Sequence, residues 1–347
     1  MIKIKYFAAL VIAGIAFNSC SKNWLDVKPD KSLVVPTTVD DMQALLNNGI
    51  FNYFLPALGE LGADNYIISD VDLTSVTNVE QNAYIWAANV FEGNQVNDWT
   101  YPYKQVLYAN TALEGLSRIP VDSSNRQSIT TLTGIGHYYR AYAFYSIADI
   151  FASPYDSATQ DTELGIPLRL SSDINDKVGR GTIRQTYSQI IGDLTQAVND
   201  LPDTQANKLL PSKSAAYGLL ARVYLNMGNY AKAFTYSDSS LKLYSHLMDY
   251  NSLDSTVSYP IPIYNNEIIY NAVLNFYNGI CLKSEVDTSL YRSYDDNDLR
   301  KTLFFNNSSG MITFRGGYSG LFLLFGGLAV DEMYLIRSEC NARLGNL

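Results

Sequence analysis

Histidine and cysteine are scarce in this 347-residue sequence, which has two of the first and three of the second. His137 and His246 stand far apart and in no metal-ligand spacing, so we expect neither a metal site nor a cofactor. Besides Cys20, only Cys281 and Cys340 occur, and two cysteines make no disulfide framework. Cys340 lies in a helical pattern that favours a buried free thiol, while a bridge to Cys281 stays open.

Basic residues are also few: 25 Lys and Arg stand against 34 Asp and Glu, for a formal net charge of -9. Proteins that bind nucleic acid cluster Lys and Arg on the surface that meets the phosphates. The charge balance therefore excludes nucleic acid as the expected partner and favours a neutral ligand or another protein.

The sequence has no apolar run long enough to span a bilayer, which takes about 20 residues. Its first segment instead has Lys3 and Lys5, an apolar stretch over residues 7–17 and a small-residue approach to Cys20. This order predicts a secretory signal peptide over residues 1–19 and an exported body over residues 20–347. A signal that ends on a cysteine is typical of bacterial lipoproteins, so we predict lipidation of Cys20; ordinary cleavage that leaves Cys20 unmodified is the alternative.

Apolar residues at spacings of three and four predict several amphipathic helices. One lies within residues 186–201, where Pro202 ends it, and another covers residues 126–151. A third runs from about Asn97 to Leu116, with Trp99 expected on its buried side.

The stretch 215–243 predicts a tetratricopeptide-like pair of helices. Ala221 and Ala233 stand where helices cross closely, aromatic residues stand where grooves are filled, and Gly228 makes the turn. One such unit cannot bury its own face, so further units are expected to stack on it. Residues 329–347 match the first helix of another unit, and we expect a chain whose C-terminal part is missing, with an uncovered apolar side on that helix.

Two long stretches between the helices, residues 50–95 and 244–326, are rich in Asn, Ser, Gly, Tyr and Phe. Irregular segments of this length are usually functional or disordered, and their aromatic content argues against disorder. The predicted fold class is therefore mainly α, a helical repeat scaffold that carries long irregular loops.

Several motifs occur in an order that resembles the SusD/RagB family of outer-membrane lipoproteins. The matching stretches are "CSKNWLDVKP", "WTYPYKQVLYANTALEGL", "HYYRAYAFYSIADIFASPY" followed by "GIPLRL", "RGTIRQTYSQIIGDLTQAVNDLP", "PSKSAAYGLLARVYLNMGNYAKAFTYSD", "SLYRSYDDNDLR" and "AVDEMYLIRSECNARLGN". The resemblance extends from Cys20 to Leu347, although members of the family are longer at the end.

The resemblance implies a tetratricopeptide-like scaffold at the cell surface that binds an oligosaccharide above a SusC-type TonB-dependent transporter. Aromatic loops suit this role, because sugar rings pack on aromatic faces. Trp86 is the leading candidate for such a platform, since it stands in a loop-like run with polar neighbours. The lower-ranked candidates are Tyr84, Asn94 and Tyr277.

Other patterns favour structural roles. Trp99 is expected in the core and Trp24 in packing of the N-terminal tail. Asp295, Asp296 and Asp298 lack the glycine and distal glutamate of a calcium loop, so a helix cap is expected there. The Ser-x-x-Lys spacing at 239–242 has no supporting motif.

Two alternatives stay open beside a non-catalytic glycan binder. One is a surface glycoside hydrolase, which needs two carboxylates about 5–10 Å apart that no motif locates. The other is a structural repeat scaffold that only docks the channel.

Overall fold

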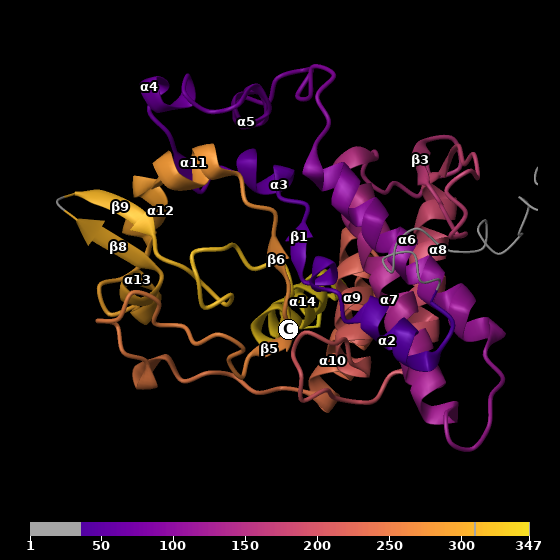
Figure 1. Cartoon of the computed structure of the whole chain (residues 1–347). Coiled ribbons are helices and arrows are strands. Elements are labelled where there is room, and N and C mark those ends of the chain that lie inside the picture. Colours follow the sequence, from indigo (N-terminus) through magenta and orange to yellow (C-terminus); the bar gives the residue numbers. More distant parts are fainter. Residues whose placement is uncertain (1–35, 309, 347) are drawn as a thin grey trace, which may run out of the picture. The chain divides into compact units, whose positions relative to one another are not determined.

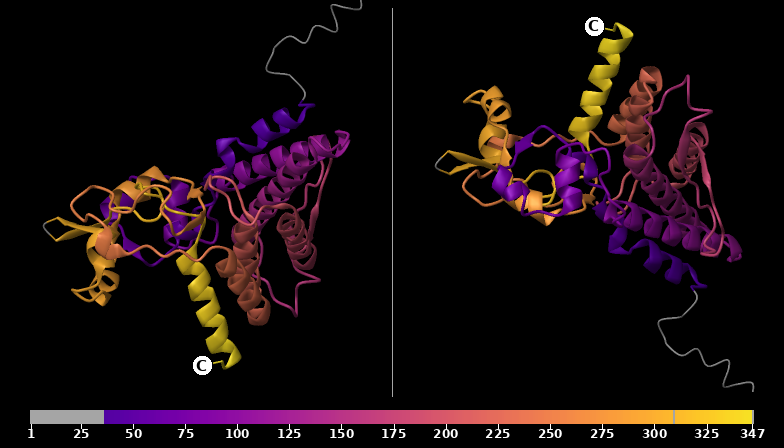
Figure 2. Two further views of the ribbon diagram at one scale, coloured as in Figure 1. Left: turned by 90° about the horizontal axis from the view of Figure 1, so that it is seen from below. Right: turned by 90° about the horizontal axis from the view of Figure 1, so that it is seen from above.

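Helices that follow one another in the sequence pack against one another in space (Figure 1). The computed structural model describes residues 36–308 and 310–346, nearly all in one unit that begins at Thr38. Each helix of the array contacts the next, as tetratricopeptide-like stacking requires. The array consists of α6 (Asn97–Arg118), α7 (Arg126–Phe151), α8 (Ile183–Asp200), α9 (Lys213–Asn226), α10 (Tyr230–Leu243) and α14 (Val330–Leu344), with α2 (Val39–Leu46) beside α6 and α7 (Figure 2).

The helix pair predicted from residues 215–243 is confirmed as α9 and α10. Ala221 and Ala233 are fully buried, and Gly228 has a φ of 71°, the left-handed conformation that a tight turn between two helices requires. Helix α8 begins earlier than its apolar spacing indicated, because Thr182 and Gln185 form a capping box at its start.

The prediction that Trp99 is a core residue was wrong, since its exposed fraction is 38%. The inward face of α6 instead carries residues at the helical spacing that includes Pro102, Gln105, Ala109 and Ala112, all of them buried. Trp99 lies to one side of that face and packs against the rings of Tyr103 and Phe151.

The two long stretches between the helices pair with each other through short ladders. Strand β1 (Tyr53–Leu55) runs parallel to β6 (Val273–Leu274), and β2 (Tyr66–Ile67) runs antiparallel to β7 (Glu285–Val286). The other antiparallel pairs are β5 (Ile268–Tyr270) with β10 (Leu328–Ala329), β8 (Phe305–Ser308) with β9 (Met311–Phe314), and β3 (Leu164–Pro167) with β4 (Arg180–Thr182). The short helices are α3 (Leu58–Leu61), α4 (Asp70–Leu73), α5 (Asn78–Tyr84), α11 (Asn278–Lys283), α12 (Thr288–Ser293) and α13 (Leu299–Leu303), with 3₁₀ turns at η3 (Gly49–Phe51) and η4 (Tyr250–Ser252).

Tyrosine residues join these short elements to the helical array. Tyr270 of β5 is fully buried and lies edge-on to Tyr138 of α7, with ring centroids 5.2 Å apart. Its hydroxyl donates to the backbone carbonyl of Phe51 at 3.0 Å and accepts from the side-chain amide of Asn52 at 3.1 Å. The aromatic core therefore fixes β5 and η3 against α7.

A buried polar network holds α6, α7 and α8 together. The guanidinium of Arg140 binds both carboxylate oxygens of Asp193, at 2.8 and 2.6 Å, and donates to the side chain of Asn110 at 2.9 Å. His137 Nδ1 lies 2.8 Å from the same carboxylate. Burial alone would raise the pKa of Asp193, but the hydrogen bonds from Arg140 and His137 outweigh it and lower that pKa.

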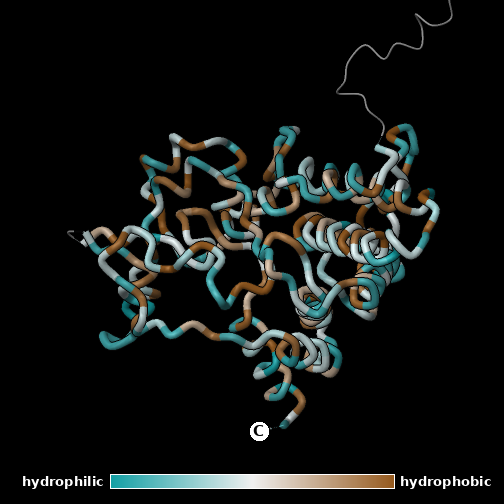
Figure 3. The backbone as a smooth tube through the Cα atoms, turned by 60° about the horizontal axis from the view of Figure 1, so that its bottom comes forward, coloured by the Kyte–Doolittle hydropathy of each residue, from teal (hydrophilic) through white to brown (hydrophobic). Residues whose placement is uncertain are grey.

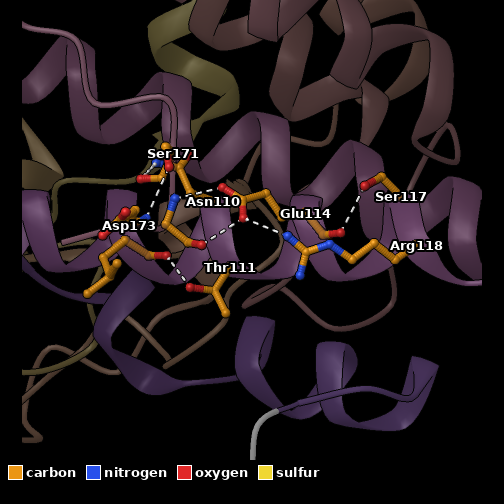
Figure 4. Close-up of polar contacts among 9 residues, drawn as sticks. Asn110, Thr111, Glu114, Ser117, Arg118, Ser171 and Asp173 are labelled. Atoms are coloured by element: carbon orange, nitrogen blue, oxygen red, sulfur yellow. Dashed lines mark hydrogen bonds and ion pairs between the residues drawn. The ribbon is translucent and has the colours of Figure 1, made fainter. Parts of the chain in front are cut away.

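Helix α6 also holds the chain that follows β3 (Figure 4). The amide of Asn110 donates to the carbonyls of Arg169 and Ser171, at 2.9 and 3.1 Å. The Glu114 carboxylate accepts from the backbone N–H and hydroxyl of Ser172, and these hydrogen bonds lower its pKa.

Hydrophobic residues alternate with hydrophilic ones along the helices (Figure 3). Of the helices that the structure describes, none combines the length and the apolarity that crossing a membrane requires.

The two described cysteines, Cys281 and Cys340, are both free, and Cys340 is buried in α14 as its helical pattern indicated.

Candidate functional site

A cavity of about 880 Å³ lies between the helical array and the short elements. Its size falls within the range of small-molecule sites. Helices α7, α9 and the first turn of α14 supply one side, while α3, the loop that follows α5 and the segment around residues 318–327 supply most of the other. The aromatic side chains in its lining are Trp86, Phe91, Tyr142, Tyr145, Tyr318 and Phe325.

Trp86 is the most exposed aromatic residue of this lining, with an exposed fraction of 80%. It follows the last turn of α5 and has a φ of 54°, a left-handed conformation that is uncommon for a large side chain. Its indole N–H donates to the carbonyl of Gly62 at 2.9 Å. The turn and the hydrogen bond together hold the indole at the cavity while leaving much of the ring exposed.

An ion pair lies on the side of the cavity formed by the helices. Arg222 of α9 binds both carboxylate oxygens of Glu332 in α14, at 2.6 and 2.7 Å. The same guanidinium donates to the hydroxyl of Tyr142 at 3.0 Å and to the carbonyl of Gly327 at 2.6 Å. Tyr142 in turn donates to the carbonyl of Gly326. Burial opposes the charge of Arg222, but Glu332 outweighs it and raises the pKa of Arg222 well above its usual range.

Three further carboxylates line the cavity without an ion pair within the described residues. Partial removal from water raises the pKa of Glu60, although this residue is exposed, and its side chain accepts no hydrogen bond from residues 36–308 or 310–346. Partial removal from water also raises the pKa of Asp149, an exposed residue, although a hydrogen bond from Asn226 at 3.0 Å and the nearby Arg222 oppose the shift. Asp331 accepts a hydrogen bond from the hydroxyl of Tyr318 at 2.9 Å through one oxygen. Its other oxygen is buried and has no hydrogen-bond partner among the described residues.

The structure separates Trp86 from the other three residues predicted to bind ligand. Tyr84 lies in α5 and is partly buried, with its ring centroid 5.5 Å from that of Tyr66. Tyr277 precedes α11 and packs in the same apolar cluster, while Asn94 is exposed in the loop before α6. None of the three belongs to the cavity lining, so their binding roles stay predictions.

Sequence reasoning missed most of the polar lining. Glu60, Asp149, Arg222 and Glu332 come from four different helices and follow no common motif. The one usable signal was the loop around Trp86, which also contains Phe91.

The other residues that the sequence singled out, where the structure describes them, lie in structural positions outside the cavity. Asp298 caps α13 by accepting from the backbone N–H of Arg300, which confirms the predicted cap, and Asp296 pairs with Lys301 at 2.8 Å. Among the residues that the structure describes, no three His, Cys, Asp or Glu side chains are grouped to hold a metal ion. The Ser-x-x-Lys residues lie in α10. Cys20 and Trp24 fall outside the described residues.

Comparisons with known proteins agree with this architecture. A SusD-like family model described as "Starch-binding associating with outer membrane" matches residues 23–225. The chain is 31% identical over 137 residues to SusD-like protein P2 of Formosa agariphila, a match that covers 39% of this chain and 25% of that protein.

Solved structures of SusD-like proteins share the fold. A SusD superfamily protein from Bacteroides thetaiotaomicron superposes with a TM-score of 0.70 at 20% identity, over 89% of this chain and 77% of that one. A laminarin-binding SusD-like protein superposes with a TM-score of 0.65 at 16% identity, over 87% and 80% of the two chains. At these identities the likeness establishes the fold.

Proposed function

Because this chain belongs to the SusD-like family, we propose that it binds an oligosaccharide without cleaving it, in the cavity beside Trp86. The observation that carries the proposal is the exposed indole, which a left-handed turn and a hydrogen bond to Gly62 hold at an 880 Å³ cavity. The family description names starch, and one structural relative is described as laminarin-binding.

The chemistry of the cavity suits a sugar. An aromatic ring face packs against the C–H face of a pyranose, and carboxylate, carbonyl and hydroxyl groups accept or donate hydrogen bonds to its hydroxyls. A site open enough to release its ligand gives affinities from micromolar to millimolar, or roughly 4–8 kcal/mol of binding free energy.

The wider role in our proposal is delivery of this glycan to a SusC-type TonB-dependent transporter. The protein would be a surface lipoprotein that is held on the outer membrane by acyl chains on Cys20. The family description, which associates its members with the outer membrane, supports this location. The helical array supports a protein partner, because stacked repeats present an extended surface.

Calorimetric titration with maltohexaose, laminarihexaose and other neutral oligosaccharides tests the binding proposal. We expect Trp86→Ala to weaken binding at least tenfold while the circular-dichroism spectrum and melting temperature stay close to those of the wild type. Ile85→Ala is the matched control, since Ile85 is an exposed neighbour outside the cavity lining. Normal binding by Trp86→Ala would place the site elsewhere.

A reducing-end assay on the same mixtures separates a binder from a hydrolase. The hydrolase alternative needs a general acid with a raised pKa, and partial removal from water raises the pKa of Glu60 and of Asp149, although both residues are exposed. We expect no new reducing ends from any oligosaccharide that binds. Their release, and its loss in Glu60→Gln or Asp149→Asn, would establish an enzyme instead.

A further inference from the structure

We propose that the cavity beside Trp86 selects its glycan by charge. It favours oligosaccharides with protonated amino groups, accepts neutral ones and rejects those with carboxylate groups. This inference rests on the proposed function, since it concerns the ligand of the same cavity.

The lining has a one-sided charge. The charged side chains that the described residues contribute are Glu60, Asp149, Arg222, Asp331 and Glu332, four carboxylates against one guanidinium. A concave site lined mainly by one sign of charge raises the local concentration of the opposite sign and lowers that of its own. The field inside this cavity is therefore attractive to cations.

Arg222, the one cationic side chain that the described residues contribute to the lining, already has hydrogen-bond partners. Arg222 donates through Nε and both terminal nitrogens, to the two oxygens of Glu332, the carbonyl of Gly327 and the hydroxyl of Tyr142. An anionic sugar would have to take this guanidinium from a bidentate partner and leave a partly buried carboxylate unpaired. Arg222 thus neutralises Glu332, and its guanidinium has few N–H donors left for the carboxylate of an anionic sugar.

The exposed carboxylates of the lining, which a ligand amine can reach, are Glu60 and Asp149. Glu60 makes no ion pair or side-chain hydrogen bond with the part of the chain that the structure describes. Asp149 accepts a hydrogen bond from Asn226 through one oxygen and lines the same cavity from α7. A protonated amine beside either group would gain a charge-assisted hydrogen bond, which is stronger than the bond that a sugar hydroxyl makes there.

The test compares three forms of each of two glycans by calorimetry. The probes are maltohexaose and laminarihexaose, with their 6-amino-6-deoxy derivatives and their derivatives oxidised to carboxylate at C6. At low ionic strength we expect the amino form to bind about two- to fivefold more tightly than the neutral parent and the carboxylate form to bind more weakly by a similar factor. In about 0.5 M salt these differences should shrink, because the screening length falls to a few ångströms.

Variants assign the effect to the cavity. Glu60→Gln and Asp149→Asn should each lower the ratio between the affinities for the amino form and the neutral parent, with both forms measured on the same variant. Asp176→Asn is the charge-matched control, because Asp176 is exposed and lies outside the lining. Folding of each variant is checked by its melting temperature.

The outcomes separate this inference from the proposed function. Equal binding of all three forms, or tighter binding of the carboxylate form, would overturn charge selection while the binding function stands. An equal loss of preference in Asp176→Asn would also overturn it, since the effect would then come from the net charge of the whole protein. Absence of binding by every form would overturn both proposals.

Discussion

Replacing Asp193 by Asn removes the negative charge from the network that joins α6, α7 and α8. The Asp193 side chain is 3% exposed and that of Arg140 is 10% exposed. The substitution would leave the Arg140 guanidinium buried without its counter-ion. Removing one partner of a buried ion pair costs about 3–5 kcal/mol.

Thermal and urea unfolding measure this loss. In a protein of this size each kcal/mol moves the melting temperature by about 2 °C, so Asp193→Asn should melt about 6–10 °C lower. The matched control is Asp161→Asn, which breaks the exposed pair with Arg184 and should melt within error of the wild type.

The pH dependence supplies an independent check. The folded-state pKa of Asp193 lies below its unfolded value of about 3.9, so its contribution to stability is complete above that pH. The contribution is lost as the pH falls through the lower, folded-state pKa. The difference in stability between wild type and Asp193→Asn should therefore shrink below about pH 4. Equal melting temperatures at pH 7, or a difference that grows in acid, would refute this account of the network.

Two further predictions concern the scaffold and the anchor. Ala221→Leu should overpack the fully buried crossing of α9 and lower the free energy of unfolding by about 1–3 kcal/mol, measured in urea; an unchanged midpoint would show that the crossing has room for a larger side chain. Cys20→Ala should move the protein from the outer-membrane fraction to the soluble fraction, and mass analysis of the wild type should find acyl chains on Cys20; a variant that stays with the membrane, beside an unmodified wild type, would contradict lipidation.

Local periodicity predicted the helical array well. Residues at spacings of three and four placed α7 and α8, and the small residues Ala221 and Ala233 placed the pair α9 and α10. These signals lie within one helix or one turn, so a single stretch of sequence contains them. The prediction that Trp99 is buried was wrong because it used local spacing alone. That spacing fits a helix, but which side of α6 faces inward depends on α7 and on the chain around Ile50.

The site depends on contacts that no local pattern contains. Arg222 and Glu332 are 110 positions apart, and the ladder between β1 and β6 joins residues near 54 and 273. Trp86 could be singled out because a lone tryptophan in a polar, aromatic-rich run is unusual. The carboxylates of the lining could not, since Asp and Glu are common throughout the chain and only the folded structure brings these few together.

Hydrogen–deuterium exchange with and without the tightest-binding oligosaccharide tests the central claim most directly. The account predicts that the ligand slows exchange in the segments 58–62, 83–91 and 325–327, each of which contributes residues to the lining of the cavity beside Trp86. Protection confined to other segments, with exchange in these three unchanged, would contradict the assignment of the glycan site to this cavity.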